Sequence, residues 1–452
     1  MLVKELSRLI GAEHVLEAPP GSPYNSDLAR RRGLHGHADA VALPGSAQEV
    51  AQVLAWCYEH DVPLTPRGGG TGLTGGAVPT AGGVVCSLER LRAVRELEPA
   101  LWRMLPEAGV STRDVQRLAR ENGLMFAPDP GASEQSQIGG NVATNAGGPH
   151  TLKYGVTGAW VAGVEVVLAP GELVEIGGWA GKDVAGYDLK SLLIGSEGTL
   201  GVITAVRLRL LPRPESALAS VLFFASLQEG CDAVMQVFAA GVMPSALDFV
   251  DGETLELATR SFPGEVPADA RFALIAEVDG SAEQARTART ELLESVAAGL
   301  LSVAEPEPGA LWRWRDGLNP LVTGTLGGKV AEDVVFPVEH LAEGLRRFHR
   351  IARENGLRSC AWGHAGDGNV HANVMVDPES ERDTLAAEAV GERLMDEVVE
   401  LGGSISGEHG LGSLKAGRLA SQWPARTLQL HEMVKRAFDP KGLLNPGKKL
   451  AR

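Results

Sequence analysis

The sequence predicts an α+β protein of at least two domains, and three observations support this fold class. Segments with the apolar alternation of strands and segments with helical periodicity follow one another along most of the 452 residues. Glycine is spread unevenly, because residues 66–201 hold 26 of the 56 glycines. The segment PRPES at 212–216, where two prolines punctuate polar residues, separates that glycine-rich part from the rest. A chain of this length usually folds into two or three domains.

The first part of the chain predicts strands and helices around two glycine-rich segments. We expect strands in ADAVALP, VPLTP, GGVVCSL and LWRMLPEAG, and helices in SAQEVAQVLAWCYEHD and STRDVQRLARENG. Ser46 and Glu49 have the spacing of a capping box at the start of the first helix. The strands WVAGVEVVLA, LVEIGG and GTLGVITAVRLRLLP follow the second glycine-rich segment.

The second part predicts an α+β domain with an antiparallel sheet that helices cover on one face. We expect strands in SVLFFAS, RFALIAEVDG, LLSVAEP and EDVVFP, and a hairpin in SCAWGHAGDGNVHANVMVD. We expect helices in LQEGCDAVMQVFAAG, SAEQARTARTELLESVAAG, VEHLAEGLRRFHRIARENG and SERDTLAAEAVGERLMDEVVELGG. The predicted division is residues 1–214, residues 215–425, and a C-terminal segment 426–452 that returns to the first part, of which RAFDPKGLLNPGKKL is turn-rich.

Charge and cysteine spacing exclude several classes of protein. A net charge of −15 argues against a general nucleic-acid binder. The four cysteines lie far apart, which disfavours an iron–sulfur cluster or a cysteine-bound zinc in this chain. No apolar run reaches the ~18 residues of a membrane span, and the N-terminus lacks the apolar core of a signal peptide. We therefore expect a soluble cytoplasmic protein.

The first glycine-rich segment, PRGGGTGLTGG at 66–76, predicts an anion-binding loop. Gly70, Gly72 and Gly75 satisfy the G-x-G-x-x-G pattern, but no helix opens at the third glycine, and the Lys and Ser/Thr of a Walker loop are absent. Successive residues without Cβ let backbone N–H groups converge on an anion, and Arg67 adds a positive charge. Diphosphate binding is therefore favoured over a flexible surface loop.

The second glycine-rich segment, at 127–158, combines glycines with side chains that form directional hydrogen bonds. Asn141, Thr144 and Asn145 supply such groups, and the glycine pairs at 139–140 and 147–148 let the backbone approach a flat ligand. Two such segments in one domain favour a long, bent cofactor with polar and aromatic parts over a mononucleotide.

Two histidines of GHAGDGNVHANV predict a metal site. The central Asp-Gly pair favours a two-residue type I′ turn, which would put His364 directly opposite His371 with their Cβ atoms about 5 Å apart. Glu408 in SGEHGLGS offers a third ligand, and the adjacent His409 points in another direction, as suits a base. Two imidazoles and a carboxylate bind Zn²⁺ or Fe²⁺. The alternatives are a structural histidine pair and an N-terminal helix cap in SGEHGLGS.

Three segments of the chain resemble one known family. PRGGGTGLTGG, IGGNVATNAGG and GYDLKSLLIGSEGTLGVITAVRLRL look like the flavin domain of the vanillyl-alcohol-oxidase/p-cresol-methylhydroxylase superfamily, in its glycolate oxidase, D-lactate dehydrogenase and D-2-hydroxyglutarate dehydrogenase branch. The resemblance runs from residue 36 to the C-terminus. It implies a two-part FAD-binding domain of the p-cresol-methylhydroxylase type in 1–214 and an α+β substrate (cap) domain with an antiparallel sheet and the metal site in 215–425. Segment 426–452 would return to the FAD-binding domain.

The resemblance also implies which residues hold FAD, and that this cofactor is bound non-covalently. The first loop would lie on the diphosphate, and the second loop with GSEGTLGVI along the ribityl chain and the isoalloxazine. The residues so assigned are Pro66, Arg67, Gly68, Gly69, Gly70, Thr71, Gly72, Leu73, Gly75, Gly76, Pro130, Gly131, Ser133, Ile138, Gly139, Gly140, Asn141, Thr144, Asn145, Gly147, Gly148, Glu197, Gly198, Val202, Ile203 and Asn445.

For the active site, the resemblance implies a divalent metal, a histidine base and an arginine that pairs with the substrate carboxylate. Zinc is favoured as the metal, with manganese and iron as alternatives. The metal ligands would be His364, His371 and Glu408, the catalytic base His409, and the substrate contacts Arg315, Asn373 and Lys329. Arg315 lies on the predicted helix LWRWRDGLNP, for which a merely amphipathic face is the alternative interpretation. Asn319 stands where one relative has a substrate-contacting Thr, which weighs against 2-hydroxyglutarate.

The function so implied is that of an FAD-dependent dehydrogenase or oxidase of a D-2-hydroxy acid such as D-lactate or glycolate. Metal-assisted proton abstraction and hydride transfer to flavin N5 would yield the 2-oxo acid. The main alternative is the flavin subunit of a glycolate oxidase complex that relays electrons to an iron–sulfur partner. An ether-lipid synthase of the same superfamily is disfavoured because no Tyr accompanies the histidine cluster, and a silent flavin-binding protein because the predicted metal and base residues are all present.

The implied partners are a small 2-hydroxy acid and a separate electron acceptor, which is a quinone, an electron-transfer flavoprotein or an iron–sulfur subunit. No nucleic acid and no transmembrane segment are expected, and a homodimer stays open. We expect a cytoplasmic location, with attachment to the membrane periphery only through a partner.

Overall fold

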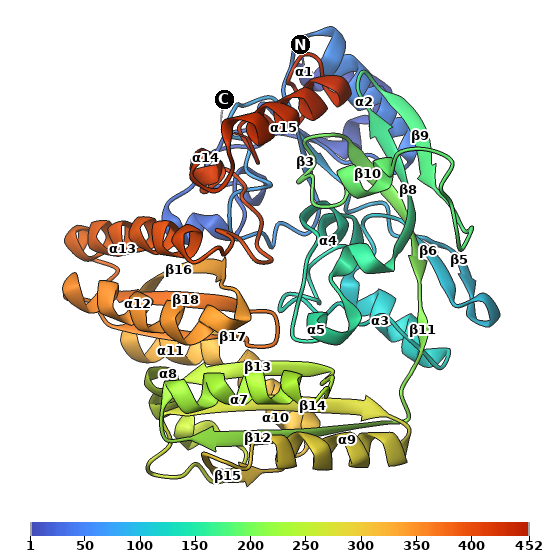
Figure 1. The fold of residues 1–452 in the computed structure, drawn as a ribbon. Coiled ribbons are helices and arrows are strands. Elements are labelled where there is room, and N and C mark those ends of the chain that lie inside the picture. The colour runs from blue at the N-terminus through green and yellow to red at the C-terminus, as the bar shows by residue number, and fades with distance from the viewer. Residues whose placement is uncertain (1, 451–452) are drawn as a thin grey trace. The chain divides into compact units, whose positions relative to one another are not determined.

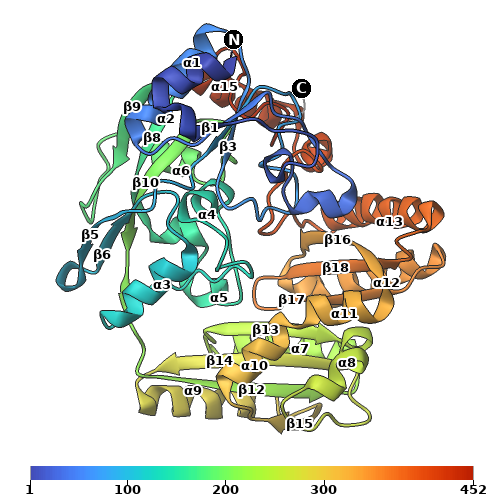
Figure 2. The ribbon, with the colours of Figure 1, turned by 180° about the vertical axis from the view of Figure 1, so that it is seen from behind.

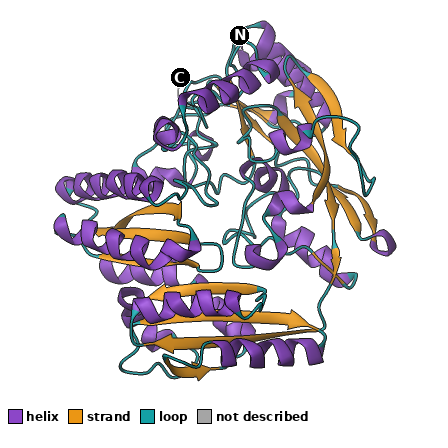
Figure 3. Cartoon of the chain, viewed as in Figure 1, coloured by secondary structure: helices purple, strands orange, loops and turns teal. Residues whose placement is uncertain are grey.

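The computed structural model describes residues 2–450, and the chain divides into two compact units (Figure 1). Unit 1 comprises Met1–Gly147, Gly155–Arg213 and Glu408–Arg452, and unit 2 comprises Gly148–Tyr154 and Pro214–Gly407. The α+β class is confirmed, because both units combine helices with sheets that are antiparallel for the most part (Figure 3). Unit 1 ends at Arg213, one residue before the predicted boundary. Segment 148–154 belongs to unit 2, and the chain re-enters unit 1 at residue 408, where the prediction had 426.

Unit 1 contains two main sheets, which can be followed from behind in Figure 2. The first has the order β1-β2-β4-β3, and β4 runs parallel to both β2 and β3. The second has the order β5-β6-β10-β8-β9 and is antiparallel throughout. The strands of the unit are β1 (Val15–Leu16), β2 (Ala40–Ala42), β3 (Leu64–Arg67), β4 (Val84–Ser87), β5 (Val94–Glu98), β6 (Arg103–Pro106), β7 (Leu124–Met125), β8 (Val161–Leu168), β9 (Glu172–Gly177), β10 (Val202–Arg209) and β11 (Leu211–Pro212).

Two N-terminal helices, α1 (Leu2–Ile10) and α2 (Ala47–Glu59), share an apolar core with the first sheet. The Ser46 hydroxyl accepts the Glu49 N–H at 3.2 Å, but the Glu49 carboxylate accepts from the Gly45 N–H at 2.6 Å. The N-cap hydrogen bond of Ser46 therefore forms. In a capping box the Glu49 carboxylate would accept the N–H of Ser46, whereas here it accepts the N–H of Gly45, the residue before. The other helices of the unit are α3 (Thr112–Glu121), α4 (Ile138–Thr144), α6 (Leu189–Leu193), α14 (Leu419–Gln422) and α15 (Ala425–Phe438).

The C-terminal segment extends the edge of the first sheet at β3. The Leu64 N–H donates to the Leu443 carbonyl at 2.9 Å, and the Leu64 carbonyl accepts the Asn445 N–H at 2.8 Å. Buried Asp439 holds this segment in place, because it accepts hydrogen bonds from the Tyr58 hydroxyl at 3.1 Å and from a backbone N–H of the tail. These contacts place Asn445 beside the glycine-rich loop that follows β3.

Unit 2 is built on one antiparallel sheet of seven strands, in the order β15-β12-β14-β13-β17-β18-β16. The expected antiparallel sheet is therefore confirmed. Its strands are β12 (Ser216–Phe224), β13 (Ala246–Asp251), β14 (Phe272–Gly280), β15 (Leu300–Ala304), β16 (Gly328–Val335), β17 (Ser359–His364) and β18 (Asn369–Val376).

Helices pack on both faces of this sheet, so the expectation of a single covered face was wrong. Two separate apolar cores lie on the two faces: Leu222 and Phe224 point into one, and Val221 and Phe223 into the other. The run SVLFF is apolar at successive positions, which is typical of a strand that is buried on both sides. The first face carries α7 (Leu227–Ala239), α9 (Ala282–Ser295), α12 (Leu341–Glu354) and α13 (Glu381–Glu400), and the second α8 (Gly252–Ala258), α10 (Pro308–Asp316) and α11 (Leu318–Leu326).

The segment Gly148–Tyr154, with α5 (Thr151–Tyr154), is anchored to β14 of unit 2 by polar contacts. Nε2 of His150 lies 2.9 Å from Oε1 of Glu277, and the Tyr154 hydroxyl donates to Asp279 at 2.6 Å. Burial would raise the pKa of Glu277, but the hydrogen bond and the charge of His150 outweigh that effect and lower it. The composition of 127–158 contains no signal for this anchoring, which depends on carboxylates more than a hundred residues away.

Candidate functional site

The first glycine-rich segment forms a tight loop directly after β3. Gly70 and Gly75 have φ angles of +67° and +83°, in the left-handed region that favours glycine. A Cβ built on Gly70 would lie 2.1 Å from a guanidinium nitrogen of Arg67. Arg67 is buried beneath the loop, where it donates to the Ser26 carbonyl at 2.7 Å, and burial lowers its pKa. The guanidinium therefore supports the loop from below, in addition to the positive charge that it supplies.

We predict that Gly70→Ala weakens FAD binding about 10- to 100-fold, because a steric overlap of this kind costs about 1–3 kcal/mol. The measurement is the flavin fluorescence recovered on titrating apoprotein with FAD. Gly123→Ala is the matched control, since Gly123 has a φ of +71° and open space around its Cβ position. Equal affinities in the two variants would show that the glycine loop does not contact the cofactor.

The second glycine-rich segment lies against the first. Its helix α4 begins after Gln137, and a Cβ on Gly68 would lie 3.5 Å from Cα of Gly140 and 3.6 Å from Oε1 of Gln137. That oxygen is buried and has no hydrogen-bond partner among the described residues. A buried acceptor without a partner is unfavourable, so the two loops together leave a polar group for a ligand to satisfy.

Several polar side chains of the second loop serve the protein itself. Nδ2 of Asn141 donates to the Thr112 hydroxyl, the Thr144 hydroxyl donates to the Gly140 carbonyl, and Oδ1 of Asn145 accepts the Gly158 N–H. These side chains shape the loop, so any hydrogen bonds to a cofactor would come chiefly from its backbone. Elsewhere, Gly131 is exposed and Ser133 is half-buried, and Val202, on β10 of the second sheet, packs into the apolar core that the first sheet shares with α1 and α2.

Glu197 and Asn445 connect the glycine loop to the turn that carries His409. Glu197 has a φ of +54°, and its carboxylate accepts the N–H groups of Leu411 at 3.0 Å and Gly412 at 2.7 Å. Nδ2 of Asn445 donates to the carbonyls of Gly76 and Glu197. The Thr74 hydroxyl also donates to the His409 carbonyl at 3.1 Å. The Glu197 carboxylate is thus used to hold the His409 turn, a role that the sequence motif did not reveal.

In unit 2, the hairpin β17–β18 carries the two predicted metal-binding histidines. Trp362 is paired with His371, and His364 with Asn369, so the prediction that His364 lies directly opposite His371 was wrong. The strands are joined by a four-residue loop, Ala365–Gly368, in place of the two-residue turn. Because the register slips by two residues, both histidines stay on one face, and their ring centroids are 5.5 Å apart.

The hairpin loop is held by the strand end that packs against it. The Phe336 N–H donates to the Gly368 carbonyl at 3.0 Å, and a Cβ on Gly368 would lie 1.9 Å from the Phe336 carbonyl oxygen. A Cβ on Gly366 would lie 2.4 Å from Cδ2 of Leu152, which packs over that glycine. These tertiary contacts, which no local sequence pattern encodes, select the longer loop.

We predict that Gly368→Ala lowers the free energy of unfolding by about 2–4 kcal/mol, from the strained φ of +76° and the close contact with Phe336. Gly356→Ala, with a φ of +73° and no atom near its Cβ position, should lose only about 1–2 kcal/mol. Chemical denaturation of both variants checks this difference. Equal losses would contradict a tightly held hairpin loop.

The predicted metal ligands come from two segments of the chain. His364 and His371 lie on one face of the sheet of unit 2, with their ring centroids 5.5 Å apart, and Glu408 opens the segment that re-enters unit 1. Glu408 directly follows Gly407, whose N–H donates to Oδ2 of buried Asp333 at 2.8 Å. Oδ1 of Asp333 accepts from Nδ2 of Asn369, so this carboxylate joins the hairpin to the turn before Glu408. Two imidazoles and a carboxylate form a donor set that suits zinc or iron.

Asp248 of β13 was not identified from the sequence, although a carboxylate in the apolar run SALDFVD is a signal. It is fully buried, and its oxygens lie 2.7 Å from Nδ1 of His364 and 2.7 Å from Nε of Arg315. Burial would raise the pKa of Asp248, but the charges of His364 and Arg315 outweigh it and lower the pKa to about 2. Arg315, predicted to bind the substrate carboxylate, is therefore also an ion-pair partner inside unit 2.

The other predicted substrate contacts lie on the same face of the sheet as His371. Nζ of Lys329 donates to Oδ1 of Asn373 at 2.6 Å and lies 4.8 Å from the ring centroid of Trp362. Nδ2 of Asn373 donates to the His371 carbonyl at 2.8 Å. Within unit 2, the sheet thus brings together cationic and amide groups suited to a carboxylate and two imidazoles suited to a metal.

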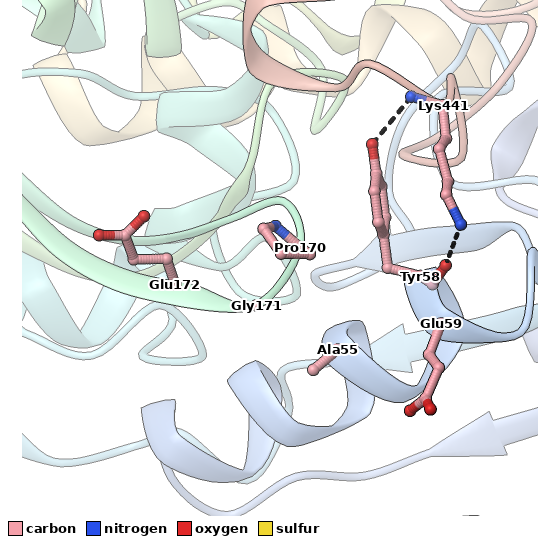
Figure 4. A pocket seen from close by; sticks show the side chains of 7 residues that line it. All are labelled: Ala55, Tyr58, Glu59, Pro170, Gly171, Glu172 and Lys441. Atoms are coloured by element: carbon pink, nitrogen blue, oxygen red, sulfur yellow. Dashed lines mark hydrogen bonds between the residues drawn. The ribbon is translucent and has the colours of Figure 1, made fainter.

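Unit 1 also carries a hollow on its surface (Figure 4). It is lined by Ala55, Tyr58, Glu59, Pro170, Gly171, Glu172 and Lys441. Lys441 closes one side, where its N–H donates to the Tyr58 hydroxyl and its Nζ to the Tyr58 carbonyl, each at 2.8 Å. No residue assigned to cofactor, metal or substrate lines it.

Comparison with known proteins places the chain in a family. The model "FAD binding domain" matches residues 38–177, and "FAD linked oxidases, C-terminal domain" matches residues 213–449. The glycolate oxidase subunit GlcD of Bacillus subtilis is 35% identical over 420 residues, which cover 92% of this chain and 89% of that protein. The D-lactate dehydrogenase of Archaeoglobus fulgidus is 34% identical over 460 residues, which cover 99% and 98%.

Among solved structures, p-cresol methylhydroxylase with substrate bound aligns with a TM-score of 0.82 at 19% identity, covering 100% of this chain and 96% of that one. The predicted fold type is thereby confirmed. This chain belongs to the FAD-linked oxidase family and is an FAD-linked oxidoreductase of the type represented by GlcD and D-lactate dehydrogenase. Within residues 2–450, no helix has both the length and the apolar character needed to cross a bilayer.

Proposed function

We propose that the protein is a dehydrogenase or oxidase of a small D-2-hydroxy acid, such as D-lactate or glycolate, and that it forms the 2-oxo acid. The observation that carries this proposal is the pair His364 and His371 on one face of the sheet of unit 2, with Glu408 and His409 directly after Gly407, the last residue of that unit. The relatives support the substrate class, since one is named a glycolate oxidase subunit and another a D-lactate dehydrogenase.

The residues of unit 1 fit FAD. The glycine loop offers backbone that a Cβ would block, and the buried Oε1 of Gln137 lies at that loop and has no hydrogen-bond partner among the described residues. We propose that loops 66–76 and 137–148 hold the cofactor, non-covalently, so acid precipitation should release the flavin. Bound FAD supplies, at N5, the acceptor for the hydride from the substrate Cα.

The donor set of unit 2 fits a divalent metal, with zinc favoured over manganese or iron. We propose His364, His371 and Glu408 as its ligands. A metal ion held there would lower the pKa of the substrate hydroxyl and orient the substrate. Arg315 would pair with the substrate carboxylate, and Lys329 and Asn373 would contribute further hydrogen bonds.

His409 is the base in this proposal. Its neutral imidazole accepts the hydroxyl proton, while the Cα hydrogen leaves with its electron pair and the carbonyl of the 2-oxo acid forms. The hydrogen bond from Thr74 to the His409 carbonyl and the contacts of Glu197 with the next residues hold the backbone of this turn. A base on a fixed turn meets the positional demands of proton transfer.

The test is anaerobic bleaching of the flavin absorbance by D-lactate, L-lactate, glycolate and D-2-hydroxyglutarate. We expect rapid bleaching by at least one D-2-hydroxy acid or by glycolate, and slow bleaching by L-lactate. Bleaching by none of the four would overturn the proposed substrate class.

A second candidate is the flavin subunit of a multi-subunit glycolate oxidase, and the name of the Bacillus subtilis relative as a subunit favours it. In both cases we propose a separate electron acceptor: a quinone, an electron-transfer flavoprotein or an iron–sulfur subunit. Turnover of the purified single chain with an artificial dye acceptor supports the independent enzyme. Fast flavin bleaching without dye turnover supports the subunit.

A further inference from the structure

Asp248 places a carboxylate in the middle of the apolar stretch ALDFV of β13. Its neighbours Leu247 and Phe249 belong to one of the two apolar cores of unit 2, and Asp248 itself has no exposed surface. Across the sheet, its direct partner on β17 is His364. A buried ionised carboxylate is unfavourable unless it is paired and hydrogen-bonded, so the contacts that it makes indicate its role.

Each oxygen of Asp248 contacts a residue assigned to the active site. Oδ1 lies 2.7 Å from Nδ1 of His364, and Oδ2 lies 2.7 Å from Nε of Arg315. An imidazole whose Nδ1 donates to a carboxylate binds a metal through Nε2, and its ring is held in one orientation. Outer-shell carboxylates of this kind typically change metal affinity by about 10- to 100-fold.

The same carboxylate also restrains Arg315. His364 belongs to the sheet, whereas Arg315 belongs to α10, so their relative position depends on what joins them. Asp248 joins them through a single rigid carboxylate, and a shift of either partner would break a buried ion pair.

We infer that Asp248 is a positioning residue that orients the metal ligand His364 and the substrate-binding Arg315 together. This inference rests on the proposed metal site. Asp248 would thereby set the distance between the metal ligand His364 and the guanidinium of Arg315, which would bind the substrate. Because Asp248 lies on strand β13, a rigid element would define this distance.

The same strand offers a matched control. Asp251, three residues further on, is also buried and also pairs with a histidine, with Oδ2 3.1 Å from Nε2 of His349. Its second oxygen accepts the Thr254 N–H and so caps α8. His349 belongs to α12, on the face of the sheet away from α10, and is not one of the proposed metal ligands. Asp251→Asn therefore removes a buried carboxylate–imidazole pair in which neither partner is a proposed ligand or substrate contact, and the amide oxygen of the variant can still accept the Ala361 N–H that Asp251 accepts at 2.7 Å.

The experiment measures Zn²⁺ affinity in the full-length, FAD-loaded protein, by competition with a chromophoric chelator. We expect Asp248→Asn to weaken zinc binding about 10- to 100-fold with unchanged FAD content. Asp251→Asn should stay within about threefold of the wild-type zinc affinity, because neither Asp251 nor its partner His349 is a proposed ligand. The visible absorption of the Co²⁺-loaded protein should change in Asp248→Asn and not in Asp251→Asn.

Three outcomes would overturn parts of this picture, and they are distinguishable. Unchanged zinc affinity in Asp248→Asn overturns the positioning role alone. An equal loss in Asp248→Asn and Asp251→Asn also overturns that role, because it shows general destabilisation of unit 2. A wild-type protein that keeps FAD but binds zinc no better than His364→Ala overturns the metal site, and this inference with it.

Discussion

Replacement of His409 by Asn should leave FAD bound and slow the reduction of the flavin by substrate about 10²- to 10⁴-fold. General-base catalysis contributes a factor of this size, and an amide of similar shape cannot accept the hydroxyl proton. Binding should change little, because the Thr74 hydroxyl contacts the His409 backbone carbonyl, which the substitution retains. The measurement is anaerobic stopped flow at saturating substrate, with the FAD content of each preparation determined beforehand.

A histidine of the same unit serves as the control for this variant. His431 is exposed on α15, so His431→Asn should reduce its flavin at the wild-type rate. If His409→Asn also reduces its flavin at that rate, His409 is not the base, and another group of the site must accept the proton.

Replacement of His371 by Gln should abolish stoichiometric zinc binding and slow flavin reduction on the order of a thousandfold. Loss of one of three protein ligands should cost more affinity than the roughly 10- to 100-fold of an outer-shell change. A bound metal contributes several kcal/mol to such a reaction, and each 1.4 kcal/mol corresponds to about a tenfold change in rate. Metal analysis of the purified variant and stopped flow check the two parts of this prediction.

Chelation and a control variant test the same site without removal of a ligand. Dialysis of the wild type against a strong chelator should reproduce the rate loss, and zinc should restore the rate. His349→Gln removes a half-buried histidine of α12 in the same unit and should keep the metal. Full activity in metal-free wild-type protein would refute a role for the metal in the reaction.

The sequence predicted the fold class and the location of the polar loops, because glycine and proline act on the backbone locally. Gly70 and Gly75 do adopt the left-handed backbone for which glycine is suited. Local patterns failed where packing decides between alternatives. The Asp-Gly pair favoured a two-residue turn, but the contact of Gly368 with Phe336 selects a longer loop.

The composition of single segments also could not show which distant residues share an ion pair. Asp248 and Arg315 are 67 residues apart, and the pairing of β13 with β17 is what brings Asp248 to His364. Likewise, Glu197 matched a flavin-domain motif, yet its carboxylate holds the turn after His409, more than two hundred residues along the chain.

The sequence by itself therefore determined the class of protein, the two glycine-rich loops and the placement of His364 and His371 on one face of the sheet. These follow from backbone freedom and from the period of two in a strand, which keeps His364 and His371 on one face even when the register shifts by two. Only the tertiary structure decided the hairpin register, the helices on both faces of the sheet, and the pairing of Asp248 with His364 and Arg315. Each of these depends on the burial of groups that lie far apart in sequence, and burial is a property of the assembled sheet.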